Sequence, residues 1–71
     1  MSGLANRLRE LREAEPRQTQ AELADALNVS RQTIIALESG KYAPSLLLAL
    51  RLGAHFGKPV EEIFWIEAGS G

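Results

Sequence analysis

The segment from residue 19 to residue 40 constrains this fold most, because it contains two short helical patterns joined by a very short turn. Thr19 is a favourable N-cap, and Glu22 three positions later completes the spacing of a capping box. This pattern predicts a helix over Gln20–Leu27. Asn28 tolerates the left-handed backbone angles found at helix ends, so we expect the helix to stop there.

A second helix is predicted immediately after that turn. Ser30 is its N-cap, the helix runs over Arg31–Glu38, and Ser39–Gly40 ends it with a glycine suited to that position. A connection this short does not allow two helices to stack antiparallel. They must cross steeply, as in a helix-turn-helix unit over residues 20–39 with residues 30–39 as its recognition helix. The expected shared core consists of Leu23, Ala24, Leu27, Val29, Ile34 and Leu37.

The rest of the chain predicts three more helices. Leucines at steps of four and three, followed by a proline, indicate an amphipathic helix before the pair. A serine N-cap and a glycine bound a longer apolar helix after it, and a lysine–proline pair opens a short last helix. The predicted ranges are Leu4–Glu15, Leu46–Phe56 and Val60–Phe64. Trp65–Glu67 is expected to be extended, so residues 1–67 form one compact all-α domain and residues 68–71 a loose tail.

Two tracts resemble the Xre/Cro–cI family of bacterial and phage repressors, in particular a compact stand-alone subgroup. One is VSRQTIIALESGKYAPSL (Val29–Leu46), and the other is the ending VEEIF (Val60–Phe64). The likeness extends over Leu8–Trp65 and implies a five-helix, lambda-repressor-like DNA-binding domain. It also implies a transcriptional regulator whose third helix lies in the major groove and which binds operators as a homodimer. Some compact members join their subunits through the last helix and a short C-terminal β-strand.

Side chains on the outer face of the second helix of the pair are candidates for contact with DNA bases: Arg31, Gln32, Ile35 and Ala36. Arginine forms a bidentate pair with guanine, and glutamine forms one with adenine. The first turn of a recognition helix makes most of the base contacts. Ile35 has two interpretations that the sequence does not separate. It contacts a thymine methyl group, or it is an apolar residue at the edge of the core.

Phosphate contacts position a domain on DNA without recognising the base sequence. Candidates lie at the helix ends and in the adjoining loops: Arg17, Gln20, Ser30, Thr33, Ser39, Lys41 and Tyr42. For Gln20 the resemblance implies a phosphate contact. The alternative for Lys41 and Tyr42 is that they are ordinary residues of a surface loop. The resemblance also implies a buried structural ion pair between Arg12 and Glu38, which assumes a one-residue insertion in Pro16–Gln20 relative to the family.

Large apolar side chains gather near the end of the chain, where a small domain has little core to bury them: Val60, Ile63, Phe64, Trp65 and Ile66. We expect a homodimer interface there, and the alternative is that these residues fold back onto the core of the same subunit. The predicted helix over Leu46–Phe56 is apolar nearly all round in its first half, which indicates burial on more than one side. Leu47 is a candidate to extend the interface or to line a small pocket.

Composition excludes several classes of function. The 71 residues contain no cysteine and a single histidine, His55, so we expect no disulfide, no metal cluster and no cofactor. No apolar run approaches the ~18 residues of a membrane span, and the first residues lack the charged and apolar regions of a secretory signal. We expect a cytoplasmic, nucleoid-associated protein without enzymatic activity, whose partner is double-stranded DNA.

The net charge of −1 fits a DNA-binding protein poorly, since phosphate contacts usually come from a basic surface. DNA binding must then use a locally basic face and weaken with salt. The alternative is a protein-interaction module, antitoxin-like or antirepressor-binding, in which DNA binding is secondary. A DNA affinity that falls steeply with salt favours the first interpretation, and absence of binding at low salt favours the second.

Overall fold

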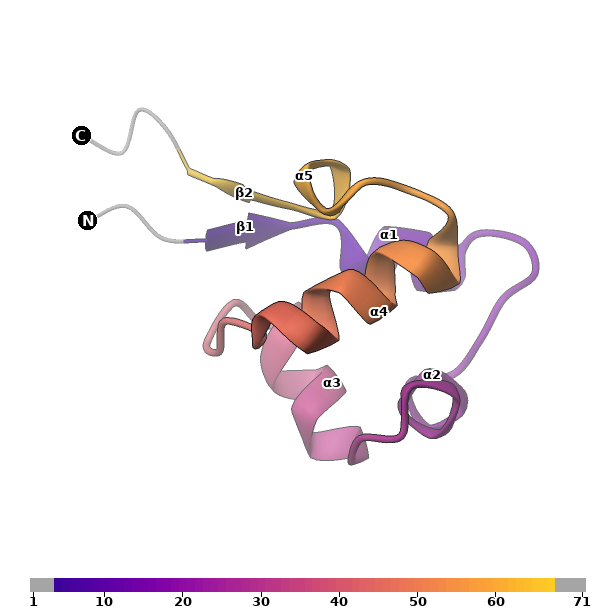
Figure 1. Ribbon diagram of the computed structural model, residues 1–71. Coiled ribbons are helices and arrows are strands. Elements are labelled where there is room, and N and C mark those ends of the chain that lie inside the picture. Colours follow the sequence, from indigo (N-terminus) through magenta and orange to yellow (C-terminus); the bar gives the residue numbers. More distant parts are fainter. Residues whose placement is uncertain (1–3, 68–71) are drawn as a thin grey trace.

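In the computed structural model, which describes residues 4–67, five helices surround one core and two short strands pair at one end (Figure 1). The elements are β1 (Leu4–Asn6), α1 (Leu8–Glu13), α2 (Gln20–Leu27), α3 (Arg31–Glu38), α4 (Leu46–Phe56), α5 (Val60–Ile63) and β2 (Phe64–Ile66). The predicted five-helix class is confirmed. None of these helices is long and apolar enough to cross a membrane. The predicted tail over residues 68–71 lies outside the described residues, as do residues 1–3.

The prediction of a single helix over Leu4–Glu15 is wrong at both ends. β1 pairs antiparallel with β2, with Asn6 opposite Phe64, and α1 begins only at Leu8. The Asn6 side chain supports this change, because its Oδ1 accepts a hydrogen bond from Leu8 N and its Nδ2 donates one to the Leu37 carbonyl, both at 3.0 Å. At its other end the chain turns extended two residues before the proline. The spacing of the leucines is compatible with either a helix or a strand at the start of the chain. The pairing with β2, which is distant in the sequence, determines that a strand forms.

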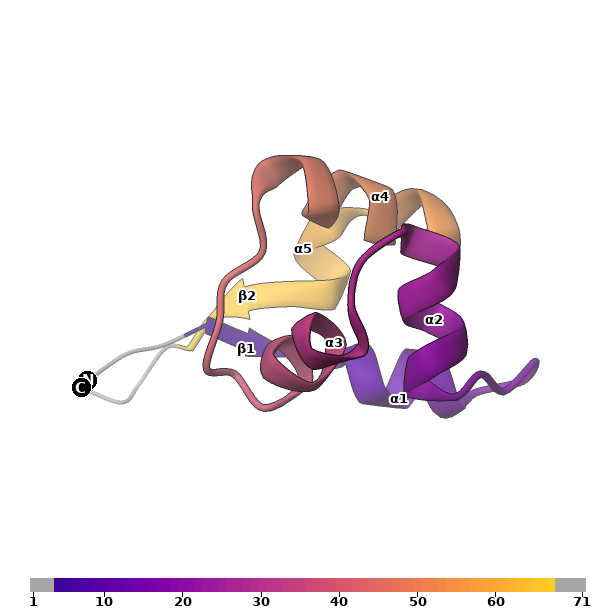
Figure 2. The same ribbon diagram turned by 90° about the horizontal axis from the view of Figure 1, so that it is seen from below.

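The caps predicted for α2 and α3 are present. Thr19 Oγ1 accepts a hydrogen bond from Glu22 N at 3.0 Å, and the Glu22 carboxylate accepts one from Thr19 N at 2.8 Å. Asn28 has a left-handed φ of 59°, and Ser30 Oγ accepts a hydrogen bond from Thr33 N at 3.2 Å. The bounds of both helices agree with the prediction. Figures 1 and 2 show the two helices crossing steeply, as their short connection requires.

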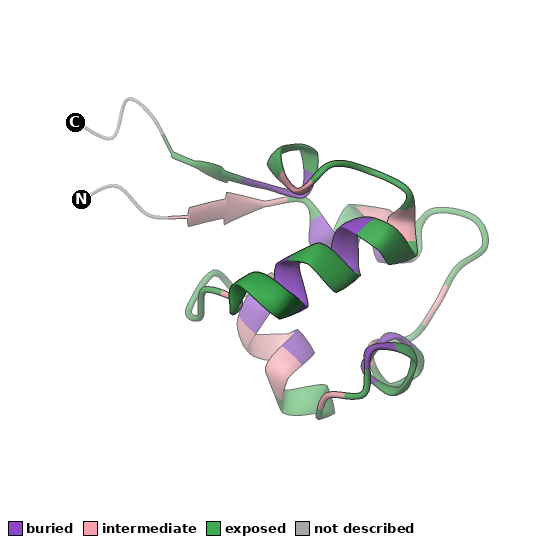
Figure 3. Cartoon of the chain, in the orientation of Figure 1, coloured by how far each residue is buried: buried purple, intermediate pink, exposed green. Residues whose placement is uncertain are grey.

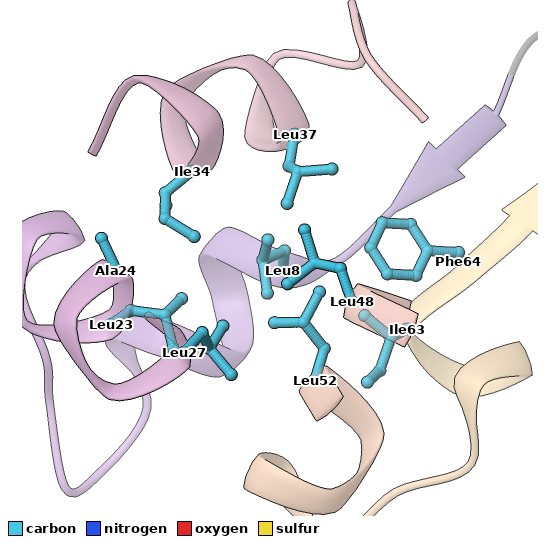
Figure 4. Packing of buried hydrophobic residues seen from close by; sticks show 10 residues of the cluster. All are labelled: Leu8, Leu23, Ala24, Leu27, Ile34, Leu37, Leu48, Leu52, Ile63 and Phe64. Atoms are coloured by element: carbon cyan, nitrogen blue, oxygen red, sulfur yellow. The ribbon is translucent and has the colours of Figure 1, made fainter. Parts of the chain in front are cut away.

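One hydrophobic core receives side chains from every helix and from β2 (Figure 4). Its members are Leu8, Leu23, Ala24, Leu27, Ile34, Leu37, Leu48, Leu52, Ile63 and Phe64. Each fully buried leucine or isoleucine stabilises the fold by about 1.5–3 kcal/mol. The core expected between α2 and α3 is confirmed, except that Val29 packs against its edge and stays half-buried. Within residues 4–67, every buried side-chain polar atom has a hydrogen-bond partner.

Within one chain, α4 is buried on one side only (Figure 3). Its outer face carries three leucines, Leu46, Leu47 and Leu50, which are 74%, 59% and 55% exposed. The predicted burial on more than one side is therefore not met inside a single subunit. On the inner side, a Cβ at Gly53 would lie 2.8 Å from the carbonyl oxygen of Lys58. Glycine thus allows α4 to approach the segment that begins α5.

Candidate nucleic-acid interface

The first turn of α3 is the most exposed part of that helix (Figure 3). Ile34 and Leu37 are fully buried, which turns Arg31 and Gln32 away from the core and into solvent. Ser30 caps the helix here, and the aligned peptide dipoles give this end a partial positive charge. Two long polar side chains suited to hydrogen bonding with base edges therefore project from a capped helix end.

The second turn of α3 is less accessible. Ile35 and Ala36 are half-buried, so each has part of its surface against the protein and part toward solvent. This position is compatible with both interpretations of Ile35, a methyl contact on DNA and packing at the edge of the core. The polar and the apolar candidates for base contact occupy successive turns of one helix.

The serine and threonine hydroxyl groups expected to contact phosphates already have partners in the protein. Ser30 Oγ lies 3.0 Å from Thr33 Oγ1, and these two hydroxyls share one hydrogen bond. Ser39 Oγ donates to the carbonyl of Ala36 at 2.9 Å. Because a hydroxyl has a single donor hydrogen, Ser39 has to give up this bond before it can donate to a phosphate.

The remaining loop candidates are exposed and lie on two sides of α3. Gly40, with a φ of 79°, ends the helix and directs the chain into the loop that carries Lys41 and Tyr42. Arg17 lies in the loop between α1 and α2. Figures 1 and 2 both place these two loops at opposite ends of the domain. Contacts from both loops suit a surface that straddles a groove and meets phosphates on either side of it.

Gln20, the first residue of α2, connects the two ends of α3. Its Nε2 donates to Glu38 Oε1 at 3.1 Å, and its Oε1 lies 3.5 Å from Arg31 Nη2, which donates to it. Gln20 and Arg31 border a polar hollow of about 470 Å³, which Arg9 and Arg12 also line. The base-contact candidate Arg31 and the phosphate-contact candidate Gln20 therefore belong to one hydrogen-bonded group.

The ion pair that the resemblance implies is present and nearly buried. Arg12 Nε and Nη2 donate to the two carboxylate oxygens of Glu38 at 2.6 and 3.1 Å, and only 10% and 7% of the two side chains are exposed. Arg12 Nη1 also donates to the Gln18 carbonyl at 3.0 Å. The hydrogen bond to Glu38 raises the pKa of Arg12 against the opposing effect of burial. Stability from this raised pKa is lost only as the pH rises through a strongly alkaline range.

The loop before α2 has a second anchor that no sequence pattern indicates. His55 Nε2 on α4 lies 2.9 Å from the side-chain oxygen Oε1 of Gln18. The loop is thus tied to α4 as well as to Arg12, and no local pattern relates residues so far apart in the sequence. Residues 4–67 contain no cluster of three or more histidine, cysteine or acidic side chains that could hold a metal ion.

Charge is distributed unevenly along the chain. Between residues 26 and 60 there are four basic residues, Arg31, Lys41, Arg51 and Lys58, and one acidic residue, Glu38. The carboxylate of Glu38 is occupied by an arginine of α1. The remaining acidic residues lie in α1, α2, α5 and the segments that adjoin them. The stretch from α3 through α4 to the start of α5 is therefore locally basic, although the whole chain is slightly acidic.

Two of the residues predicted at a dimer interface are buried within their own chain. Ile63 and Phe64 are 0% and 6% exposed and belong to the core of their own chain. In Figure 4 both side chains lie beside Leu48. The pairing of β2 with β1 fixes Phe64 at the start of β2, directly opposite Asn6. Folding back onto the same subunit, the alternative that the sequence left open, is what occurs at these two positions.

The other three residues predicted at that interface border an apolar groove. Val60 is half-buried and Ile66 is 75% exposed, and they line a groove of about 470 Å³ together with Leu4, Ala43, Pro44 and Ala49. Trp65 borders it at 39% exposure, with its ring centroid 5.1 Å from the guanidinium carbon of Arg7. The exposed Leu46 lies one helical turn before Ala49, so the apolar surface continues onto α4.

Comparison with known proteins agrees with this geometry. A helix-turn-helix family model matches residues 8–63, which include all five helices. The chain is 42% identical over 64 residues to the uncharacterized HTH-type transcriptional regulator YgzD of Bacillus subtilis, covering 90% of this chain and 96% of that protein.

It is also 57% identical over 49 residues to the uncharacterized HTH-type transcriptional regulator MJ0272 of Methanocaldococcus jannaschii, covering 69% of this chain and 74% of that protein. An uncharacterized HTH-type regulator of Methanothermobacter thermautotrophicus is 52% identical over 50 residues, covering 69% of this chain and 72% of that protein. The steeply crossed α2–α3 pair, its exposed first turn and these matches lead to one conclusion. The chain is a member of the Xre/Cro–cI family of helix-turn-helix transcriptional regulators, with a helix-turn-helix DNA-binding domain.

Proposed function

We propose that this protein is a repressor that binds a pseudo-palindromic DNA operator as a homodimer, with α3 in the major groove. The observation that carries the proposal is the first turn of α3, where Arg31 and Gln32 are exposed at a capped helix end. Buried Ile34 and Leu37 fix which face of the helix points outward. That face presents side chains that discriminate between base pairs.

Each of the two polar residues has a preferred base. Arg31 offers a fork of donors that matches guanine O6 and N7, and Gln32 offers one donor and one acceptor that match adenine N6 and N7. Each good bidentate pair supplies about 1–3 kcal/mol of discrimination. Half-buried Ile35 and Ala36 then approach the bases only through van der Waals contact, and Ile35 suits a thymine methyl group.

Phosphate contacts come from the exposed loops on either side of α3. Arg17 and Lys41 supply two cations per subunit, with Tyr42 and one hydroxyl of the Ser30–Thr33 pair as neutral donors. Ser39 joins them once it releases the Ala36 carbonyl. A dimer then neutralises about four phosphates, so the logarithm of the DNA association constant should fall against the logarithm of the salt concentration with a slope of about −3.6. This modest slope agrees with the small basic surplus of the α3 region.

A second copy of the chain covers the apolar groove in this proposal. Val60 and Ile66 line the groove, and the exposed Leu46 and Leu50 extend it along α4. A two-fold axis through this surface leaves the exposed turn of α3 free on each subunit. Two recognition helices about 34 Å apart on successive major grooves read enough base pairs for useful specificity.

Selection of bound sequences from a random DNA pool tests base recognition. We expect a pseudo-palindromic consensus with half-sites about one helical turn apart. Arg31→Ala should abolish the preference at one base pair of each half-site, and Arg51→Ala on α4 serves as the matched control with an unchanged consensus. A pool that stays random at low salt, or an Arg31→Ala protein with the wild-type consensus, contradicts the proposal.

Sedimentation equilibrium tests the dimer. Ile66→Asp and Leu50→Glu each place a charge in the proposed interface, and we expect both to produce monomers that remain folded, because neither side chain is buried in the monomer. Ala26→Glu on the exposed face of α2 is the control and should leave the dimer intact. A wild-type protein that is monomeric both alone and on DNA contradicts the homodimer.

A protein-interaction module is the second candidate function. The exposed leucine face of α4 and the net charge of −1 favour it, because the same surface can bind a partner of another kind. Absence of DNA binding at low salt would favour this second function over the first.

A DNA-binding regulator is expected to act in the cytoplasm on the nucleoid.

A further inference from the structure

We propose that Glu38 is a positioning residue for base recognition, acting through the side-chain amide of Gln20 on Arg31. The inference rests on the proposed function, because it assumes that Arg31 contacts a base. It adds a role for Gln20 beyond the phosphate contact expected from the sequence, because the NH₂ group has a second hydrogen. The residues involved come from the start of α2 and from both ends of α3.

The carboxylate of Glu38 is held rigidly. Oε2 accepts from Arg12 Nε at 2.6 Å, and Oε1 accepts from both Arg12 Nη2 and Gln20 Nε2 at 3.1 Å. Only 7% of the Glu38 side chain is exposed, and the two-pronged contact with the guanidinium fixes the plane of the carboxylate. Glu38 therefore presents a fixed, ionised acceptor to the first residue of α2.

This acceptor determines which way the Gln20 amide points. An ionised carboxylate accepts hydrogen bonds and donates none, so Gln20 must turn its NH₂ group toward Glu38. The carbonyl oxygen of the same amide then points to the other side, where Arg31 Nη2 lies 3.5 Å away. With the amide reversed, two oxygens would face each other at Glu38 and two donors would face each other at Arg31. The charges on both sides thus select a single orientation.

The selected orientation tethers Arg31 before DNA arrives. A guanidinium has five N–H donors, and the contact with Gln20 engages one nitrogen, which leaves the others for guanine O6 and N7. A side chain that is already held loses less conformational freedom on binding. Arg31 also borders the polar hollow with Gln20 and Glu38, so the tether holds it on the side of α3 that faces α2. Glu38 thereby sets the direction from which Arg31 reaches its base.

A double-mutant cycle on sequence preference tests this chain of contacts. Gln20→Met keeps the shape of the side chain and removes both hydrogen bonds, while the buried pair of Arg12 and Glu38 stays intact. We expect the discrimination at the base pair identified by Arg31→Ala to fall about tenfold in Gln20→Met. Adding Gln20→Met to Arg31→Ala should cause no further loss at that base pair, since the tethered group is already absent. Gln18→Met is the matched control, and its base preference should equal that of the wild type.

A phosphate contact as the sole role of Gln20 predicts a different result. Gln20→Met then weakens binding equally for all DNA sequences and adds to the effect of Arg31→Ala. Either this outcome or an unchanged preference overturns the inference while the proposed function stands. If Arg31→Ala itself leaves the preference unchanged, the base contact assigned to Arg31 is wrong, and the inference falls with it.

Separate measurements test the role of Glu38. Glu38→Gln should reproduce the loss of discrimination seen in Gln20→Met and add nothing to it. Because removal of this charge also disturbs Arg12, side-chain amide exchange in the wild-type protein decides the matter without any variant. We expect the NH₂ hydrogens of Gln20 to exchange about tenfold more slowly than those of the exposed Gln32. Equal exchange rates overturn the role of Glu38.

Discussion

The α2–α3 pair and the paired ends of the chain are built in different ways. Local signals bound α2 and α3: Thr19 and Ser30 cap them, and Asn28 forms the turn between them. The ends are defined by each other, because β1 forms only where β2 pairs with it. The difference teaches that local capping chemistry specifies the α2–α3 pair, whereas contacts between distant segments specify the paired ends of the chain.

The two regions also differ in surface chemistry. The first turn of α3 is polar, and a hydrogen-bonded group that includes Gln20 and Glu38 holds it. The groove beside β2 and the outer face of α4 are apolar, and Leu46 and Ile66 are each about three-quarters exposed. Groups in fixed directions suit the recognition of bases, and an apolar surface suits the burial of a second chain.

The largest effect is expected where α1, the helix that follows β1, is joined to the α2–α3 pair. Arg12→Met removes one partner of the nearly buried pair with Glu38 and should lower the free energy of unfolding by about 3–5 kcal/mol. The control is Arg9→Met, which removes an exposed pair with Glu13 and should cost no more than about 1 kcal/mol. Urea unfolding followed by circular dichroism measures both. Equal losses would mean that the buried pair does not join α1 to α3.

The next effect concerns α4 and α5, the helices that precede β2. Gly53→Ala places a Cβ 2.8 Å from the backbone oxygen of Lys58, which should force α4 and α5 apart and cost about 1–3 kcal/mol. Gly57→Ala meets no atom within 4 Å, and its left-handed φ of 65° alone should cost about 1 kcal/mol. Thermal unfolding compares the two variants. A larger loss for Gly57→Ala would show that α5 is not held tightly against α4.

A smaller effect is expected in the α2–α3 pair. Ser30→Ala removes the cap of α3 and should cost about 1 kcal/mol. Amide hydrogen exchange should show the loss in the first turn of α3, while the exchange of α5 amides changes only with global stability. Ser39→Ala at the other end of α3 is the control, with a loss of a few tenths of a kcal/mol because its site is exposed. Uniform exchange changes after Ser30→Ala would contradict local specification of this turn.

The smallest effect is expected at the turn between α2 and α3. Asn28→Gly retains the left-handed angle and should change stability by less than about 0.5 kcal/mol. Asn28→Ala must adopt the same angle with a Cβ and without the amide, and should cost about 1 kcal/mol. Chemical unfolding of the two variants separates these values. A neutral Asn28→Ala would mean that the turn does not depend on the left-handed residue.

Most of the candidate site was predictable from the sequence, since caps and the spacing of buried residues fix which face of α3 is outward. The Arg12–Glu38 pair followed from resemblance, because nothing near Arg12 in the sequence indicates its partner on another helix. The contacts of Gln20 with Glu38 and Arg31 were not predictable for the same reason. Each of these Gln20 contacts joins α2 to α3, and only the packing of α2 across α3 brings the two side chains within hydrogen-bond distance.

The sequence by itself determined the helix-turn-helix unit, its bounds and the polar first turn of α3. These features depend on capping and hydrophobic spacing over a few residues, which a short segment contains in full. Only the tertiary structure decided that residues 4–6 form a strand and that Ile63 and Phe64 complete the core. The same apolar residues are compatible with a helix or a strand, and with a place in the core or at a subunit interface. The choice depends on which distant segments supply hydrogen-bond partners and space, and folding alone brings those segments together.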